Sequence, residues 1–477
     1  MHFKTIFKSL KNKDMLKRVC VILGIIVAYR LLAQIPVPMG DASTFKEAVS
    51  NLLDKSDFSS FLNLISGGGL ASFSIILVGL SPYITGSIVV QLLTKAIPSL
   101  EELSNDGEAG RRKINQWTRM LTVPLAIIQS IAYIFILYKT TISANIATDF
   151  VPTTKDWMLS ITAMTAGSVL LMWMGELVTE QGIGNGISTL IFASIISQLP
   201  TTMASLGNAL FDTSEGSLSL FGWFELPVNP TIFWIVLGFA VAMMAVIYFL
   251  VKLNEAQRII TINYAKRVHG NSSYGGIKSI LPIKMIAAGV IPVIFATAFL
   301  SLPALIGQVI TSVNPGNSFG ESLVTIFSAP SASNFSAVYP DGITAQWFVY
   351  PAFYFVLVFL FTYFYTSIIF NTKEIADNLQ KQGGFIEGIR PGISTAKYLG
   401  KVVNRLDLFG ALALGLVAML PFITDYIFIV VTGAPIGLSI SGTGLLIVVT
   451  VALENLRSIN SRALMITYDD FGDELEN

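Results

Sequence analysis

The residue types that most often carry out chemistry in proteins are scarce and isolated in this sequence. His2 and His269 are its only histidines, Cys20 is its only cysteine, and none of them has Cys, Asp or Glu neighbours at metal-site spacing. The glycine-rich stretch from Gly182 to Gly186 follows no predicted strand and lacks the Lys-Ser/Thr pair of a phosphate-binding loop. We therefore expect a protein that is not an enzyme and that has no metal, no cofactor and no intramolecular disulfide.

The composition indicates a membrane protein. The chain has 477 residues, of which 53% are hydrophobic and only 13% are charged, and its mean hydropathy is +0.67. These values lie far outside the balance of a soluble globular domain. Because Cys20 lies in an apolar run, we predict that it is buried as a small hydrophobic residue.

Ten apolar stretches are long enough to cross a bilayer as helices, each needing about 20 residues. The first follows a basic N-terminal stretch and looks like a signal peptide, but no small-residue cleavage site comes after it, so we interpret it as a retained helix. The sequence thus predicts an all-α polytopic membrane protein. The predicted spans are 17–35, 73–94, 118–138, 157–178, 184–200, 231–252, 282–304, 347–370, 406–428 and 437–456.

The distribution of lysine and arginine predicts the orientation. If the N-terminus is cytoplasmic, 25 of the 30 basic residues fall on the cytoplasmic side and five on the other. This asymmetry follows the positive-inside rule and places both termini in the cytoplasm.

Topology alone does not name the function, because many secondary transporters also have ten helices with both ends inside. Ion-coupled carriers place charged side chains at mid-membrane, where each costs about 2.5–3.5 kcal/mol. The predicted spans are uncharged through their middle, which argues against a small-molecule transporter. A membrane-embedded structural subunit without a pore is the second alternative.

Blocks of sequence along nearly the whole chain resemble the SecY/Sec61-alpha family in its bacterial form, and they occur in the family's order. The blocks are 79–93 (GLSPYITGSIVVQLL), 107–119 (GEAGRRKINQWTR), 175–188 (GELVTEQGIGNGIS), 263–267 (NYAKR), 288–296 (AGVIPVIFA), 376–381 (ADNLQK), 388–392 (GIRPG) and 442–448 (GTGLLIV).

This resemblance implies ten transmembrane helices in two inverted five-helix halves around a central hourglass pore. The implied parts are an N-terminal half at 1–200, an external hinge at 201–230, a C-terminal half at 231–456 and a cytoplasmic tail at 457–477. The implied function is that of the central subunit of the protein-conducting channel, which translocates unfolded preproteins and releases transmembrane segments sideways into the cytoplasmic membrane.

The resemblance also implies a ring of apolar side chains at the waist of the pore. Such a ring offers a passing chain no hydrogen bonds, and a narrow apolar constriction opposes water and ions. The match at all of its positions argues against a structural subunit without a pore. The ring residues are Leu80, Ile84, Ile187, Ile191, Ile294 and Ile447.

A short amphipathic piece at about 58–70 lies where the family has its plug, which blocks the external funnel. A half-buried external loop is the alternative for this segment. The implied plug residues are Phe61, Leu62, Leu64, Gly67, Gly68 and Gly69.

Helices two and three are expected to oppose helices seven and eight as a lateral gate. Two polar gate positions of the family match Gln91 and Gln129, and Ser87 is a further expected gate residue. At the third family position an asparagine is replaced by Ile286, which removes an interhelical hydrogen-bonding side chain worth about 1 kcal/mol in membranes.

Two long cytoplasmic loops, 252–284 and 371–405, are expected to dock the ribosome, through ribosomal RNA and proteins, or the motor ATPase SecA. The implied docking residues are Arg258, Lys266, Arg267, Arg390 and Lys397. Ser272 and Ser273 replace a basic pair that often precedes the tyrosine of the first loop, so contacts of that pair do not carry over. The implied partners are the small subunits SecE and SecG, SecA, the ribosome, preprotein and signal-sequence substrates, and the lipid bilayer.

Overall fold

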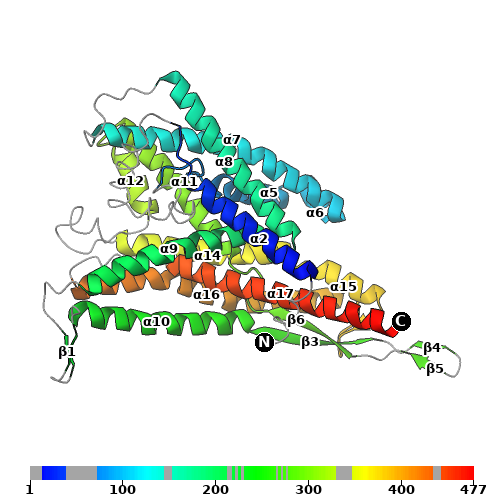
Figure 1. Cartoon of the computed structure of the whole chain (residues 1–477). Coiled ribbons are helices and arrows are strands. Elements are labelled where there is room, and N and C mark those ends of the chain that lie inside the picture. The colour runs from blue at the N-terminus through cyan, green and yellow to red at the C-terminus, as the bar shows by residue number, and fades with distance from the viewer. Residues whose placement is uncertain are drawn as a thin grey trace. The chain divides into compact units, whose positions relative to one another are not determined.

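The computed structural model describes residues 13–38, 72–143, 153–211, 218–220, 224–226, 230–264, 267–269, 272–274, 278–328, 346–432 and 442–476. These residues are mostly helical (Figure 1). They form two compact units, which are described separately. Unit 1 comprises Met1–Phe233, Thr297–Pro351 and Phe422–Asn477, and unit 2 comprises Trp234–Ala296 and Ala352–Pro421.

Helices dominate both units. The helices are α2 (Lys13–Leu32), α5 (Ser81–Ala96), α6 (Pro98–Asn105), α7 (Gly107–Ser143), α8 (Thr154–Glu180), α9 (Gly186–Leu210), α10 (Pro230–Glu255), α11 (Ile291–Val313), α12 (Ser318–Phe327), α14 (Gln346–Ile369), α15 (Thr372–Lys381), α16 (Ile393–Thr432) and α17 (Gly442–Glu476). The strands are β1 (Leu218–Leu220), β2 (Phe224–Leu226), β3 (Gln257–Tyr264), β4 (Arg267–His269), β5 (Ser272–Tyr274), β6 (Lys278–Lys284) and β7 (Gly384–Phe385).

Six described helices are long and apolar enough to cross a bilayer, which confirms a multi-span membrane protein. The helical stretches are Gly107–Lys139, Thr154–Glu180, Ile232–Glu255, Ile291–Val313, Phe348–Lys381 and Ile393–Leu420. A shorter apolar helix covers Gly186–Pro200. The remaining predicted spans correspond to α2, α5 and α17, and the number ten stays a prediction.

Four predicted helix starts are wrong. The span predicted from 118 belongs to a helix that already begins at Gly107. The span predicted from residue 73 becomes helical only at Ser81, and the span predicted from 282 begins at Ile291, because residues 278–284 form strand β6. The span predicted from 406 begins earlier, at Ile393, so the chain before it is helical rather than loop.

The prediction that Cys20 is buried is also wrong, because its side chain is exposed. Helix α2 buries only one narrow stripe, formed by Met15, Ile22 and Tyr29 at seven-residue spacing. Cys20 lies off this stripe, on a helix that also exposes Leu23.

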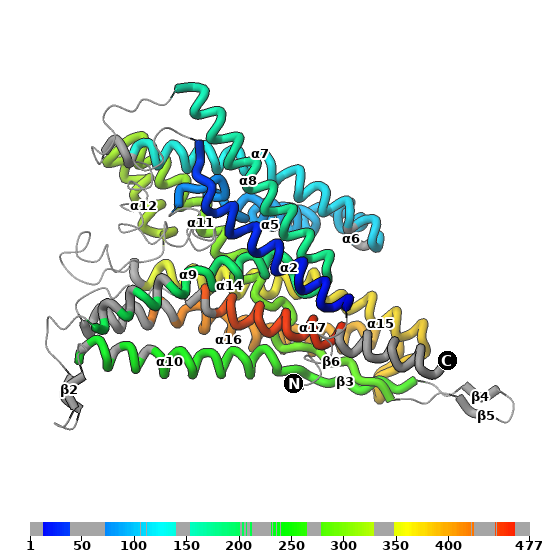
Figure 2. Tube along the Cα trace, viewed as in Figure 1, coloured from blue at the N-terminus to red at the C-terminus, as the bar shows by residue number. Residues whose placement is uncertain are grey.

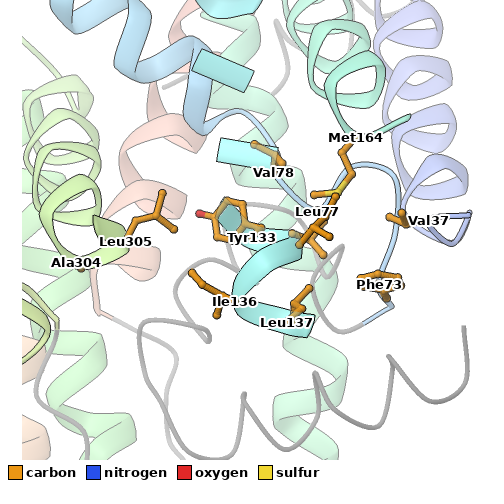
Figure 3. Packing of buried hydrophobic residues seen from close by; sticks show 11 residues of the cluster. Val37, Phe73, Leu77, Val78, Tyr133, Ile136, Leu137, Met164, Ala304 and Leu305 are labelled. Carbon is orange, nitrogen blue, oxygen red and sulfur yellow. The ribbon is translucent and has the colours of Figure 1, made fainter. Parts of the chain in front are cut away.

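A buried apolar cluster holds one end of unit 1 together (Figure 3). Tyr133 and Leu137 of α7 lie among side chains of α8, α11 and the segment before α5. The cluster also contains Val37, Phe73, Leu77, Val78, Ile134, Ile136, Met164, Ala304 and Leu305.

At the other end of unit 1, α2 packs along α8 (Figures 1 and 2). Met15 and Ile22 of α2 are buried with Val178 of α8 and Ile183 of the following turn. Arg18 of α2 donates a hydrogen bond of 2.9 Å to the carbonyl oxygen of Gln181, just after the C-terminus of α8. A cation at this position satisfies a free carbonyl and complements the helix dipole.

Gly167 of α8 permits a close backbone approach in unit 1. A methyl group at this position would collide with the carbonyl of Ile75, which belongs to the irregular segment before α5. The neighbouring Ser168 donates a 3.0 Å hydrogen bond to the carbonyl oxygen of Gly79 in the same segment. Helix α8 thus covers backbone that could not be left open to lipid.

We predict that Gly167→Val destabilises the protein by about 1–3 kcal/mol or more, because a backbone carbonyl cannot move aside as a flexible side chain can. The measurement is the thermal unfolding midpoint in detergent. Gly24→Val is the matched control, because nothing lies within 4 Å of a side chain added there. Equal midpoints for the two variants would contradict this account of the packing.

Candidate functional site

The first two predicted ring residues lie where an irregular segment becomes helix α5. Residues 72–80 form a series of turns, and Gly79 has a φ of 62°, which favours glycine. Leu80 is the N-cap of α5, Pro82 follows in its first turn, and Ile84 donates its backbone N–H to the Leu80 carbonyl. Leu80 and Ile84 are both buried, at 2% and 3% exposure.

Helix α11 in unit 2 begins in the same way. Gly289 has a φ of 63°, Pro292 lies in the first turn, and Ile294 follows the proline by two residues, as Ile84 follows Pro82. In both units, a glycine of a neighbouring helix also packs against the backbone just before the helix start. The carbonyl of Met285 lies against Gly410 of α16, as the Ile75 carbonyl lies against Gly167 of α8.

This internal repeat could have been found in the sequence. Gly79, Pro82 and Ile84 recur as Gly289, Pro292 and Ile294 at a constant offset. Both stretches resemble family motifs, and the constant offset between them is a separate signal of an internal repeat.

The glycine-rich turn between α8 and α9 precedes two further predicted ring residues, Ile187 and Ile191. Asn185 caps α9, and its side-chain oxygen accepts hydrogen bonds from the backbone N–H groups of Ile187 and Ser188. Gly186 leaves room for the carbonyl of Gly175, and its N–H donates to the Thr179 hydroxyl at 3.0 Å.

Helix α17 packs against this turn and against α9. Asn455 lies over Gly184 and contacts the Thr189 hydroxyl, and Arg462 lies over Gly182. Both glycines have positive φ, 73° and 69°, so the turn needs glycine for its backbone as well as for space.

Within unit 1, the predicted ring residues of α9 and α17 thus lie on two helices that pack against each other. Ile191 of α9 and Ile447 of α17 are both buried, and Ile187 is half-buried against Gly175 of α8. Ile294 is buried in unit 2, at 7% exposure. The ring itself stays a prediction.

The predicted gate residues of unit 1 are polar side chains on apolar helices. Gln91 donates a 3.0 Å hydrogen bond to Ser87 one turn earlier on α5. Gln129 of α7 is 3% exposed, and its side-chain oxygen has no partner among the described residues. Helices α5 and α7 approach closely here because Gly86 lies against Thr122.

Ile286 lies in unit 2 and is not in a helix. It belongs to the turns between β6 and α11, is 6% exposed, and packs near Gly410 of α16. The predicted plug at 58–70, with Phe61, Leu62, Leu64, Gly67, Gly68 and Gly69, lies outside the described residues.

The two predicted loops of unit 2 share one small sheet. Strand β3 pairs antiparallel with β6, from Gln257 opposite Lys284 to Asn263 opposite Lys278, and its other edge pairs with β7. Pro282 is tolerated because β6 is an edge strand, with the order β6-β3-β7. These strands were not predicted, although apolar and polar residues alternate in β3 from Ile260 to Asn263.

One apolar core joins these loops into what we call the sheet module, formed by β3, β6, β7, α15 and the first turns of α16. Ile260 and Ile283 of the first loop are buried with Ile386, Leu399 and Val403 of the second. Side chains assigned to docking in different loops therefore belong to one folded body.

Three side chains predicted to dock partners, Arg258, Arg390 and Lys397, are exposed on the sheet module. Arg390 has a fixed base, because its carbonyl oxygen accepts a 2.9 Å hydrogen bond from Thr395 and the preceding Ile389 packs into the core. Arg267 lies in strand β4 of the β4–β5 hairpin, and Lys266 is outside the described residues.

Two charged features were not expected from the sequence. Arg119 of α7 pairs with Glu176 of α8 at 2.6 Å, so these charges satisfy each other as well as facing water. Asp407 was missed. It is 4% exposed in α16 near Thr366 of α14, well inside a helix that begins at Ile393.

No group of three His, Cys, Asp or Glu side chains in the described part of the chain could hold a metal ion. The arrangement contains apolar side chains at helix starts, close backbone packing and an exposed basic module.

Comparison with known proteins identifies close relatives. The SecY family model matches residues 74–456. The chain is 38% identical to the protein translocase subunit SecY of Corynebacterium glutamicum over 471 residues, covering 97% of this chain and 98% of the relative. It is 36% identical to the same subunit of Mycobacterium tuberculosis over 470 residues, with 97% and 98% covered.

Solved structures share the fold. A structure described as a protein-conducting channel matches with a TM-score of 0.58 and 18% identity, over 92% of this chain and 90% of that one. Sec61 in a canine ribosome–channel complex matches with a TM-score of 0.57 and 18% identity, with the same coverage.

The sheet module gives a test of its own. We predict that Ile260→Ala destabilises the module by about 2–5 kcal/mol, because it removes a buried side chain from the core that joins both loops. Hydrogen–deuterium exchange of the β3 and β7 amides should then increase. Ile259→Ala is the control, since this neighbour is 51% exposed. Unchanged exchange in Ile260→Ala would show that the loops do not share a core.

Proposed function

The chain belongs to the SecY family, and on that premise we propose that it is the central subunit of a protein-conducting channel. It translocates unfolded preproteins across the bacterial cytoplasmic membrane and releases transmembrane segments sideways into it. The relatives are named protein translocase subunits along nearly their whole length, which supports this function.

The observation that carries the proposal furthest is the repeated helix start. Helices α5 and α11 each begin with a positive-φ glycine, a first-turn proline and an isoleucine two residues later. Each start is covered by a glycine of a neighbouring helix within its own unit. Such a repeat is expected if the chain consists of two inverted halves, 1–200 and 231–456, joined by the external hinge at 201–230 and followed by the tail at 457–477.

Within this channel the pore ring consists of Leu80, Ile84, Ile187, Ile191, Ile294 and Ile447. Burial of five of these side chains and half-burial of Ile187 support their location away from lipid. An apolar ring can seal against ions and still let side chains of any type pass, because it holds none of them by hydrogen bonds. The assignment of Ile294 to the ring rests on its motif and on the repeated helix start.

The plug is assigned to residues 58–70, and the lateral gate to Ser87, Gln91, Gln129 and Ile286. The motif matches support these assignments. Ile286 cannot supply the hydrogen bond expected at its position, so polar contacts in this gate are limited to the other residues.

The sheet module is the proposed docking site for SecA and the ribosome, with SecE and SecG as small membrane partners. Exposed Arg258, Arg390 and Lys397 on one folded body support it. A relative in fold is described in a complex with the ribosome. Both termini are proposed to be cytoplasmic, because 25 of the 30 basic residues then obey the positive-inside rule.

The seal can be tested by changing two ring residues together. Ile84→Ser with Ile191→Ser should wet the constriction and raise the ion conductance of the resting channel in planar bilayers. The control is Ile127→Ser with Ile196→Ser, two isoleucines of α7 and α9 that are 39% and 38% exposed. Conductance equal to that of the control would remove Ile84 and Ile191 from the ring.

Substitutions of Arg390 can distinguish directed hydrogen bonding by its guanidinium from a simple effect of its positive charge. If its guanidinium makes directed hydrogen bonds to SecA, worth about 1.5–3 kcal/mol, Arg390→Lys should weaken SecA binding by about tenfold or more. Arg390→Glu should abolish ATP-driven transport of a preprotein into vesicles that contain equal amounts of each variant. Arg405→Lys makes the same change at an exposed arginine of the same loop that is not assigned to docking, and it is the control. Transport at the wild-type rate by Arg390→Glu would contradict a docking role and leave Arg390 as a charge that only contacts solvent.

A further inference from the structure

We propose that Asn455 of α17 is a positioning residue for the pore ring, acting through Thr189 of α9. It holds α17 against the turn that opens α9 and thereby fixes the register of the two helices that carry Ile191 and Ile447. This inference rests on the proposed ring, and its test is designed to separate the two.

Three contacts show that α9 and its turn run antiparallel to α17 within unit 1. Arg462 lies over Gly182, Asn455 lies over Gly184 and beside Thr189, and Gly444 faces Ile195, with 3.5 Å from an added Cβ to Ile195 Cγ2. Ile191 and Ile447 each lie within about one helical turn of the last contact. Because α9 and α17 are regular helices, a contact that fixes their relative position at Asn455 also fixes the relative position of Ile191 and Ile447.

The hydrogen-bonding capacity of Thr189 explains how Asn455 is held. A threonine hydroxyl has one hydrogen, and Thr189 donates it to the carbonyl oxygen of Asn185 at 2.9 Å. The hydroxyl oxygen can then accept from the Asn455 amide nitrogen, 3.4 Å away. The amide oxygen of Asn455 is left against Gly184, where a side chain would displace it.

Both ends of the chain support this turn. Ile183, between the two glycines, is buried with Met15 and Ile22 of α2 and packs near Ile459 of α17. Arg18 of α2 holds the Gln181 carbonyl beside it. The turn is therefore fixed on several sides, and the Asn455 side chain of α17 bonds directly to Thr189 of α9.

A polar contact matters here because lipid does not drive helices together. Packing and hydrogen bonds hold membrane helices in place, and one such bond is worth little enough that its loss loosens a pair without unfolding it. Asn455 is therefore expected to set register rather than to determine whether the protein folds.

The register can be measured by disulfide formation between Ile195→Cys and Gly444→Cys in a Cys20→Ala background. Asn455→Leu and Thr189→Val should each slow crosslinking by about three- to twentyfold, the range expected for one interhelical hydrogen bond in a membrane. The double variant should be no slower than the slower single variant, because both remove the same contact.

Two control variants test the chemistry. Thr189→Ser keeps the hydroxyl and should crosslink at the parent rate. Asn460→Leu makes the same change of side chain five residues further along α17, on another face of the helix, and should also leave the rate unchanged. Thr189→Val keeps the side-chain shape, so it tests the contact even if Asn455→Leu does not fold.

Resting ion conductance provides the second measurement, with the same variants but without the cysteine pair. Slower crosslinking together with raised conductance is the expected result. Crosslinking at the parent rate in both Asn455→Leu and Thr189→Val would overturn the inference. Slower crosslinking with parental conductance would support the contact between the helices but contradict the assignment of Ile191 and Ile447 to the ring.

Discussion

A membrane-embedded chain must satisfy its backbone internally, because lipid donates and accepts no hydrogen bonds. Regular helices meet this requirement by themselves, but the irregular segments before α5 and α11 cannot. Both are covered at close range, since the Ile75 carbonyl lies against Gly167 and the Met285 carbonyl lies against Gly410. Ser168 then supplies the Gly79 carbonyl with a direct hydrogen bond. The positions of the two proposed ring isoleucines at these helix starts depend on this cover.

Close packing replaces the hydrophobic effect as the force between these helices, and small residues make it possible. The turn between α8 and α9 shows how specific the requirement is. Gly182 leaves room for Arg462, Gly184 for Asn455, and Gly186 for the Gly175 carbonyl. Each glycine is therefore required by contact with a different neighbour. This stretch resembles a phosphate-binding loop in composition, but its glycines serve close packing against α8 and α17. Its neighbours lie far away in the sequence, which is why composition alone could not explain it.

The sequence predicted what depends on local composition and missed what depends on distant partners. Apolar runs located the spans because transfer from water to lipid acts on each segment separately. Strand β6 was mistaken for the start of a helix because Ile283 owes its burial to Ile260 and Leu399. Cys20 was placed inside because a run of apolar residues does not show which face of a helix is covered. Family motifs selected ring positions, and local geometry in each unit agrees with their burial, but only a test of the seal can establish the ring.

The replacement of the family asparagine by Ile286 changes what the proposed gate can use. Isoleucine forms no side-chain hydrogen bond, and Ile286 is already packed in its own unit near Gly410. The polar groups left for the gate lie on α5 and α7, where Gln91 bonds to Ser87 while the buried Gln129 oxygen has no partner among the described residues. A buried acceptor without a donor costs free energy. In the proposed gate, the polar contacts therefore fall to Ser87, Gln91 and Gln129 rather than to the position of Ile286.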